Sequence, residues 1–178
     1  MTAAGRPAVV LFDRDGTLVV DVPYNGDPEL VAPMPTARAA LAALRAAGVA
    51  TGVVTNQSGI ARGLLDERAV AAVNARVEFM LGPFAVWCVC PHGPDDGCTC
   101  RKPRPGMVLA AAARLGLPPE RIAVIGDIGA DVVAAAEAGA RSVLVPTPVT
   151  RAAEVLAAPV VRRDLLSAVR HLLDEDDP

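Results

Sequence analysis

Two aspartates that stand two positions apart, Asp13 and Asp15, directly follow a short apolar segment. Residues 8–12 of that segment have the composition of a buried parallel strand, which places both carboxylates at the carboxyl end of the strand. Carboxylates held so close repel each other, and each loses solvation if the site is enclosed. A divalent cation would offset that repulsion, and the bound cation could in turn bind a phosphate ligand. An ordinary Asp-Gly turn after a strand also explains this stretch.

Further polar side chains follow the later apolar segments in the same manner. Thr55, Asn56, Gln57 and Ser58 come directly after the segment 49–54, and Asp127 closely follows the segment 122–125. In a doubly wound parallel sheet, ligands bind in the crevice at the carboxyl ends of the strands. Each signal is weak alone, because capping residues and solvated lysines are common. Their occurrence together and in order predicts one binding rim, which holds Asp13, Asp15, Thr55, Asn56, Lys102 and Asp127.

A second group of potential ligands lies in one loop. Cys90, His92, Cys98 and Cys100 offer three thiolates and one imidazole, a complete tetrahedral set for zinc. Cysteines clustered in a reducing compartment favour a metal over disulfides. Four protein ligands leave no open position, so we expect a structural zinc in the loop at about 88–102; buried or redox-active cysteines are the alternative. Cys88 would face the same side of its strand as Cys90, and we interpret it as a core residue that could compete as a ligand.

The elements that must position these residues alternate along the chain. Strand patterns at 8–12, 49–54, 84–89, 122–125 and 142–145 alternate with helix patterns at 36–48, 66–81, 105–115, 131–139, 150–157 and 163–173. This alternation predicts one α/β domain over 1–178, a doubly wound, mainly parallel sheet flanked by helices. The segment 18–35 is rich in proline, which predicts a long binding loop. Within it, Asp21 and Tyr24 either bind a ligand or are ordinary polar residues of a loop.

Composition excludes several classes of protein. The net charge of −3 and the absence of a basic stripe argue against nucleic acid as a partner. There is no run of 18 apolar residues and no signal peptide, so we expect a cytoplasmic protein, a monomer without a membrane partner.

The chain lacks a Gly-x-Ser-x-Gly elbow, a phosphate loop and a dinucleotide fingerprint. Of its two histidines, His92 belongs to the cysteine group and His171 is interpreted as a surface residue. The chemistry must therefore rely on carboxylates and a cation.

Taken in order, Asp-x-Asp-Gly-Thr, a strand-end Thr, a Lys and Gly-Asp-x-x-x-Asp resemble the motifs of the haloacid dehalogenase (HAD) superfamily of phosphotransferases. The stretches 13–17 and 55–63 and the Cys-x-His…Cys-x-Cys-Arg-Lys-Pro loop resemble one branch of it. That branch holds the D-glycero-D-manno-heptose-1,7-bisphosphate 7-phosphatases and the histidinol-phosphate phosphatases. The resemblance covers residues 9 to about 145 and implies a HAD-like Rossmannoid fold.

The resemblance also implies roles for the rim. Asp13 would be the nucleophile that forms an aspartyl-phosphate, and Asp15 would protonate the departing oxygen and then deprotonate the attacking water. Magnesium would be held by Asp13, the main-chain carbonyl of Asp15 and Asp127. Thr55 and Lys102 would bind phosphate oxygens. Asp131 would orient the site rather than bind the metal.

The spacing of the motifs leaves no room for a cap domain. About 40 residues separate Asp15 from Thr55, and about 47 separate Thr55 from Lys102, and each gap already contains a helix and a strand of the core. We therefore expect a capless enzyme with an open crevice, shaped by the loop 18–35 and the zinc loop. An open crevice suits a small phosphorylated metabolite.

By resemblance, the substrate would be contacted by Asp21, Tyr24, Asn56, Gln57, Ser58 and Arg101. The implied function is a magnesium-dependent sugar-phosphate phosphatase that removes the 7-phosphate of a heptose 1,7-bisphosphate. Histidinol phosphate is the alternative substrate, because Ile128 stands where heptose bisphosphatases often have a Lys. A polynucleotide 3′-phosphatase is disfavoured by the acidic balance. From another class of function, a non-catalytic zinc-stabilised binding module is the alternative.

Overall fold

The computed structural model describes residues 5–174, so the outermost parts of the expected domain, 1–4 and 175–178, lie outside the described residues. Within the described part, five strands form one parallel sheet in the order β3-β2-β1-β4-β5. The strands are β1 (Val9–Phe12), β2 (Ala50–Asn56), β3 (Val86–Cys90), β4 (Ile122–Gly126) and β5 (Arg141–Leu144). The predicted doubly wound sheet is confirmed. Because β3 extends one residue further than predicted, Cys90 ends a strand instead of beginning a loop.

Strand β1 is the centre of the sheet, and its four residues are completely buried. It pairs with β2 on one side and with β4 on the other, so that Val9 is in register with both Ala50 and Ile122. The continuous apolar run of β1 is what a strand covered on both faces requires. Asp13 continues the ladder, since its N–H donates to the carbonyl of Ile125 at 3.0 Å. The carboxylate that follows β1 therefore emerges between two neighbouring strand ends.

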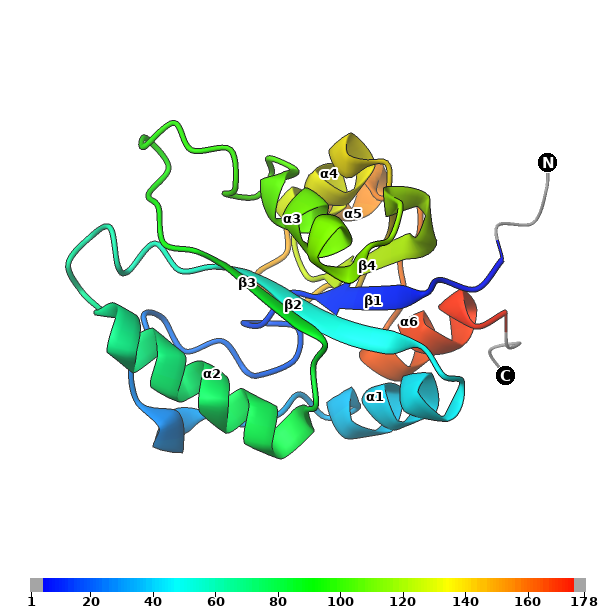
Figure 1. The fold of residues 1–178 in the computed structure, drawn as a ribbon, viewed down its shortest axis with the longest axis horizontal. Coiled ribbons are helices and arrows are strands. Elements are labelled where there is room, and N and C mark those ends of the chain that lie inside the picture. Colours follow the sequence, from blue (N-terminus) through cyan, green and yellow to red (C-terminus); the bar gives the residue numbers. More distant parts are fainter. Residues whose placement is uncertain (1–4, 175–178) are drawn as a thin grey trace.

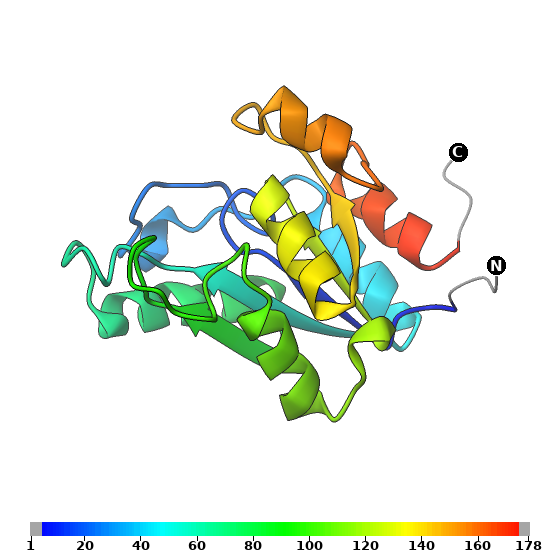
Figure 2. The ribbon, with the colours of Figure 1, turned by 90° about the horizontal axis from the view of Figure 1, so that it is seen from above.

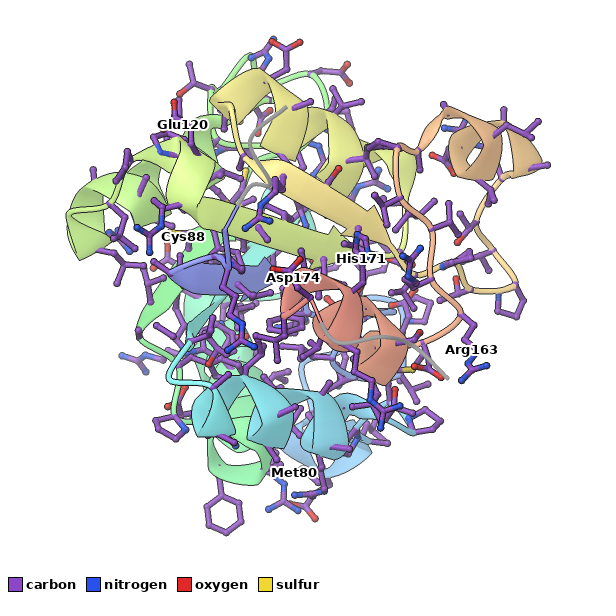
Figure 3. All side chains as sticks on the ribbon, turned by 90° about the vertical axis from the view of Figure 1, so that its right-hand side faces the viewer. Met80, Cys88, Glu120, Arg163, His171 and Asp174 are labelled. Atoms are coloured by element: carbon purple, nitrogen blue, oxygen red, sulfur yellow. The ribbon has the colours of Figure 1, made fainter. Side chains whose placement is uncertain are left out.

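Helices cover both faces of the sheet. One layer holds α1 (Ala37–Ala46), α2 (Glu67–Leu81) and α6 (Leu165–Leu172); the other holds α3 (Gly106–Leu115), α4 (Gly129–Ala138) and the short α5 (Ala152–Ala157) (Figure 1). Two separate apolar clusters fill the layers: Leu41, Val73 and Val169 belong to the first, and Met107, Val108 and Ala135 to the second. The same layering is visible from the end of the sheet in Figure 3.

Helix starts differ in detail from the predictions. Asp66 caps α2 as expected, because its carboxylate accepts from the N–H of Ala69 at 2.7 Å. Thr36 precedes α1 but makes no side-chain capping bond. Helix α4 begins at Gly129, two residues before the predicted start, so that Asp131 lies in its first turn and accepts from the N–H of Ile128 at 3.3 Å.

The loops that follow β1, β2 and β3 gather at one end of the molecule (Figures 1 and 2). The long loop after β1 contains only a 3₁₀ turn, η1 (Pro28–Leu30), and a second such turn, η2 (Pro119–Arg121), precedes β4. In the described residues no further folded unit is inserted into these loops, as expected of a capless enzyme. None of the described helices has the length and hydropathy that crossing a membrane would require.

Candidate active site

Lys102 lies at the centre of the rim and is almost completely buried. Its Nζ atom lies 2.8 Å from Oδ1 of Asp13 and 2.6 Å from Oδ1 of Asp131, and it also donates to the carbonyl of Val54 at 2.9 Å. Burial alone would lower the pKa of this ammonium group, but Asp13 and Asp131 outweigh burial and hold the pKa above its usual value. Lys102 is therefore a permanent cation between two carboxylates.

Three buried carboxylates meet beside this lysine. Oxygen atoms of Asp13, Asp127 and Asp131 all lie within 4.8 Å of one another. Burial, followed by the nearby Asp131, raises the pKa of Asp127 to about 7; burial also raises the pKa of Asp13, although Lys102 opposes the shift. Crowded carboxylates with raised pKa values are groups that a cation would stabilise in charged form, and oxygen ligands suit magnesium. The donor set therefore fits a magnesium ion.

Two glycines allow the backbone to approach these carboxylates. Gly16 has φ +75°, and a Cβ atom there would lie 2.5 Å from Oδ2 of Asp127. A Cβ atom on Gly126 would lie 2.2 Å from Cγ of Asp131. Both distances are far below van der Waals contact, so a side chain at either position would displace an acidic group. Thr150 fixes the same segment from the other side, because its hydroxyl donates to the carbonyl of Asp127 at 2.7 Å.

The carboxylate of Asp15 lies outside this cluster and is held by other partners. Nη2 of Arg14 lies 2.9 Å from Oδ2 of Asp15, and Nε2 of Gln57 donates to the same oxygen at 2.8 Å. Gln57 also donates to the hydroxyl of Thr55 at 2.9 Å. The structure thus joins Asp15 and Thr55 through Gln57. Metal binding by the main-chain carbonyl of Asp15 remains a prediction.

Asn56, a predicted substrate contact, also has a structural role at the rim. Its Nδ2 donates to the carbonyl of Lys102, and its Oδ1 accepts from the N–H of Lys102, both at 3.1 Å. The amide therefore fastens the backbone of the loop after β3 to the end of β2. This reciprocal pair explains how a lysine 46 residues away is held at the rim.

The expected substrate residues separate into two hollows. A cavity of about 280 Å³ is lined by Arg14, Asp15 and most of the predicted contacts, namely Asp21, Tyr24, Asn56, Gln57 and Ser58. Arg101 instead lines a second hollow of about 190 Å³ together with Lys102 and Arg104, and its guanidinium donates to the carbonyl of His92 at 3.2 Å. Burial, and then the charge of Asp15, raise the pKa of Asp21 above its usual value. A ligand that spans the rim could contact both hollows.

Tyr24 has an unusual backbone conformation, with φ 52°. This is the left-handed region that non-glycine residues seldom occupy. The guanidinium of Arg62 lies 5.7 Å from the centre of the Tyr24 ring, within cation–π range. The tyrosine is thereby held at the wall of the cavity of about 280 Å³.

The four predicted zinc ligands are brought together. Atoms of Cys90, His92, Cys98 and Cys100 all lie within 4.8 Å of one another. The sulfur of Cys90 lies 3.2 Å from that of Cys100 and 3.9 Å from that of Cys98, and Nδ1 of His92 lies 3.2 Å from the sulfur of Cys100. A tetrahedral zinc with Zn–S bonds of about 2.3 Å separates its sulfurs by about 3.8 Å. The cluster therefore fits a zinc ion closed to further ligands.

Cys88 is buried on the same side of β3 as Cys90, as predicted, and packs in the apolar cluster against α3. It does not belong to the group of four ligands. Nη1 of Arg114 approaches its sulfur at 3.7 Å. Cys88 is thus placed as a core residue.

Three residues around the site were not found from the sequence. Arg14 holds Asp15, Asn74 holds Arg14 through a 2.7 Å hydrogen bond, and Thr150 holds Asp127. An arginine between two aspartates is a signal of a charge partner that could have been noticed. Asn74 and Thr150 carry no such signal, because their roles depend on segments that meet only in the folded chain.

This fold, with its acidic cluster and buried lysine at the carboxyl end of the central strand, defines a hydrolase of the HAD class, and a family model described as HAD-hydrolase-like matches residues 99–172. A D-glycero-β-D-manno-heptose-1,7-bisphosphate 7-phosphatase of Pseudomonas putida is 40% identical over 144 residues, 78% of this chain and 82% of the relative. One of Vibrio cholerae is 35% identical over 182 residues, 94% of this chain and 96% of the relative. The chain belongs to this family of phosphatases.

A solved structure supports the same assignment. The D,D-heptose 1,7-bisphosphate phosphatase of Bordetella bronchiseptica, in complex with magnesium and phosphate, superposes with a TM-score of 0.83 at 34% identity. The match covers 94% of this chain and 99% of that one.

Proposed function

We propose that this protein removes the 7-phosphate of D-glycero-D-manno-heptose 1,7-bisphosphate by way of an aspartyl-phosphate. The observation that carries the proposal is the position of Lys102 between Asp13 and Asp131, beside the carboxylate of Asp127. This arrangement provides a nucleophile, the positively charged side chain of Lys102 and a site for magnesium within one rim. The names of the relatives support the choice of substrate.

Asp13 is the proposed nucleophile. Among the described residues, hydrogen bonds reach its carboxylate at Oδ1, from the N–H of Arg14 and from Lys102, both at 2.8 Å. Oδ2 is therefore the oxygen free to attack phosphorus, and the bond from phosphorus to the sugar oxygen breaks as the new bond forms. Magnesium held by Asp13, Asp127 and the carbonyl of Asp15 would neutralise the repulsion between carboxylate and phosphate.

Asp15 is the proposed acid and base. It gives its proton to the departing sugar oxygen, and it then takes a proton from the water that attacks the aspartyl-phosphate. The second step releases inorganic phosphate and regenerates the carboxylate of Asp13. Asp15 returns to its protonated form, so the cycle balances.

Thr55 and Lys102 are the proposed phosphate ligands. The hydroxyl oxygen of Thr55 already accepts from Gln57, which leaves its proton available for a phosphate oxygen. Asp131 and Asn56 are proposed to position Lys102, one through its ammonium group and the other through its backbone. A donor directed at developing charge contributes about 100-fold or more to the rate.

The two hollows support a bisphosphate as substrate. The sugar would occupy the cavity of about 280 Å³ beside Asp21, Tyr24, Gln57 and Ser58, and the guanidinium of Arg101 in the second hollow would meet the distal phosphate. Histidinol phosphate is the second candidate, favoured by Ile128, which borders a mainly apolar cavity of about 610 Å³ where a lysine would have supplied charge. A non-catalytic module is disfavoured, because all the acidic residues and the lysine are present.

The wider setting is proposed from the same features. We take residues 1–178 as one domain, with the zinc ion as a structural element of the loop that carries Arg101 and Lys102. The net charge of −3 supports a small phosphorylated metabolite rather than a nucleic acid as partner, in a cytoplasmic monomer.

The test compares kcat/KM for heptose 1,7-bisphosphate, the corresponding 1-phosphate and histidinol phosphate, each with magnesium. We expect the bisphosphate to be preferred more than tenfold over histidinol phosphate and to lose only its 7-phosphate. A tenfold preference for histidinol phosphate would reverse the choice of substrate. Residual magnesium-dependent turnover in Asp13→Asn would exclude the proposed nucleophile.

A further inference from the structure

Arg14 is a buried arginine, with 1% of its surface exposed, between the two catalytic candidates Asp13 and Asp15. A buried guanidinium group needs partners for its donors. Nε and Nη2 are directed at the carboxylate of Asp15, and Nη1 donates to Oδ1 of Asn74 at 2.7 Å. One side chain thus connects the rim to helix α2.

The two oxygens of Asp15 are bonded unequally. Oδ2 receives Nη2 of Arg14 at 2.9 Å, Nε2 of Gln57 at 2.8 Å and the more distant Nε of Arg14 at 3.2 Å. Among the described residues, Oδ1 receives only Nε of Arg14, at 3.1 Å. A proton placed on Oδ2 would face donors, whereas Oδ1 keeps an open lone pair. Oδ1 is therefore the oxygen with room for a further hydrogen-bond partner.

Asn74 lies in the middle of α2, between the buried residues Val73 and Val77. Asparagine is a poorer helix former than alanine, because its side chain competes for backbone hydrogen bonds. Here its amide oxygen is instead used by Arg14, 60 residues away in the sequence. Removing that acceptor would leave a buried donor unpaired and free the guanidinium to turn.

We propose that Asn74 and Arg14 are positioning residues that hold Asp15 with its Oδ1 atom toward the departing oxygen of the substrate. This inference rests on the proposed role of Asp15 as acid and base. Its consequence is specific: the need for a correctly placed acid depends on the leaving group. An alkoxide must be protonated as it leaves, whereas p-nitrophenolate leaves without a proton.

The experiment measures alcohol release in a single turnover, with the full chain in excess and magnesium present. The substrates are a sugar phosphate that the wild type hydrolyses and p-nitrophenyl phosphate. Asn74→Leu removes the acceptor at similar size, and Asn74→Asp keeps an acceptor. Arg68→Leu, at an exposed position of the same helix, is the matched control. Asn74→Ala replaces Asn74→Leu if thermal melting shows that the latter does not fold.

We expect Asn74→Leu to slow release of the sugar about 10- to 100-fold, as a misplaced catalytic group does. Release of p-nitrophenolate should fall by less than about threefold, and Asn74→Asp should restore sugar release to within about threefold of the wild type. Equal slowing of both substrates, or no slowing, would overturn the inference while leaving the phosphatase intact. A wild type that hydrolyses neither ester would overturn the proposed function, and the inference with it.

Discussion

Nζ of Lys102 lies 2.8 Å from Oδ1 of Asp13, although the two residues come from different loops. The pair is almost completely enclosed, since the two side chains are 2% and 12% exposed. A carboxylate buried without a cation would be driven towards its neutral form, which is a poor nucleophile. The lysine therefore opposes the upward pKa shift that burial imposes on Asp13, and it leaves the second carboxylate oxygen for attack.

Replacing the lysine should affect both activity and stability. In Lys102→Met, Asp13 and Asp131 become buried carboxylates without a counter-charge, so we expect unfolding in denaturant to require about 3–5 kcal/mol less free energy. The rate should fall about 100-fold or more with the loss of a phosphate ligand. Adding Asp131→Asn to this variant should recover part of the stability but none of the activity. A double variant as unstable as Lys102→Met would contradict the assigned ion pair.

The acid cluster gives stability a dependence on pH that magnesium should reverse. Burial raises the pKa of Asp127 to about 7 in the fold, against an ordinary value of 3.8. Between about pH 4 and pH 7 the folded chain therefore holds a proton that the unfolded chain releases, so the metal-free protein should lose stability as pH rises through this window. We expect Asp127→Asn to melt higher than the wild type at pH 8 in chelator, by about 4–8 °C.

The same comparison at pH 4, where this window begins, is the control, because little of the loss has then accumulated and the advantage of the variant should largely vanish. Magnesium should stabilise the wild type at pH 8 and have little effect on the variant. If both proteins respond equally to magnesium, Asp127 is not a ligand.

The zinc loop should be needed for the position of Lys102. We expect one zinc per chain by elemental analysis, and Cys98→Ser should lower zinc content and reduce kcat about tenfold, since the loop leads directly into Arg101 and Lys102. Cys88→Ser is the matched control: Cys88 is buried but lies outside the ligand group, so zinc content should not change. Loss of zinc from Cys88→Ser would show that the surplus thiol is a ligand.

Residues at strand ends were the ones that the sequence could predict. Asp13, Thr55 and Asp127 follow buried apolar segments. In a parallel sheet the carboxyl ends of the strands lie at one edge, so these residues are brought together independently of the other contacts in the chain. The zinc ligands lie close in sequence, so local spacing was enough. Partners joined across long separations were not accessible: Arg14 meets Asn74 over 60 residues, because α2 packs beneath the rim only in the fold.

The hydrogen bonds of individual side chains were equally hidden. Asn56 was expected just beyond its strand but is the last residue of β2, and both ends of its amide are taken by the backbone of Lys102. Arg101 adjoins Lys102 in sequence, but its bond to the carbonyl of His92 places it in the second hollow. Sequence position located the rim, and tertiary contacts decided which groups face it.

The titration of His171, at the edge of the sheet remote from the rim, should affect the stability of the protein. His171 was interpreted as a surface residue, but it is half-buried on α6 and, with Asp174 nearby, lines a cavity beside β5 (Figure 3). Its Nδ1 lies 2.7 Å from Nη2 of Arg162, a contact that requires an unprotonated ring nitrogen. Burial, and then the charge of Arg162, lower the pKa of His171 below its ordinary value of 6.5.

Because the unfolded chain takes up a proton on His171 first as pH falls below 6.5, the protein should lose stability from there down through the lowered pKa of the fold. His171→Gln keeps an acceptor for Arg162 but cannot titrate, so its urea midpoint should fall less between pH 7.5 and pH 5 than that of the wild type. Both proteins should have similar midpoints at pH 7.5, where the histidine is neutral in either state. Parallel losses in the two proteins would mean that acid destabilisation arises elsewhere and that the contact with Arg162 does not govern the titration of His171.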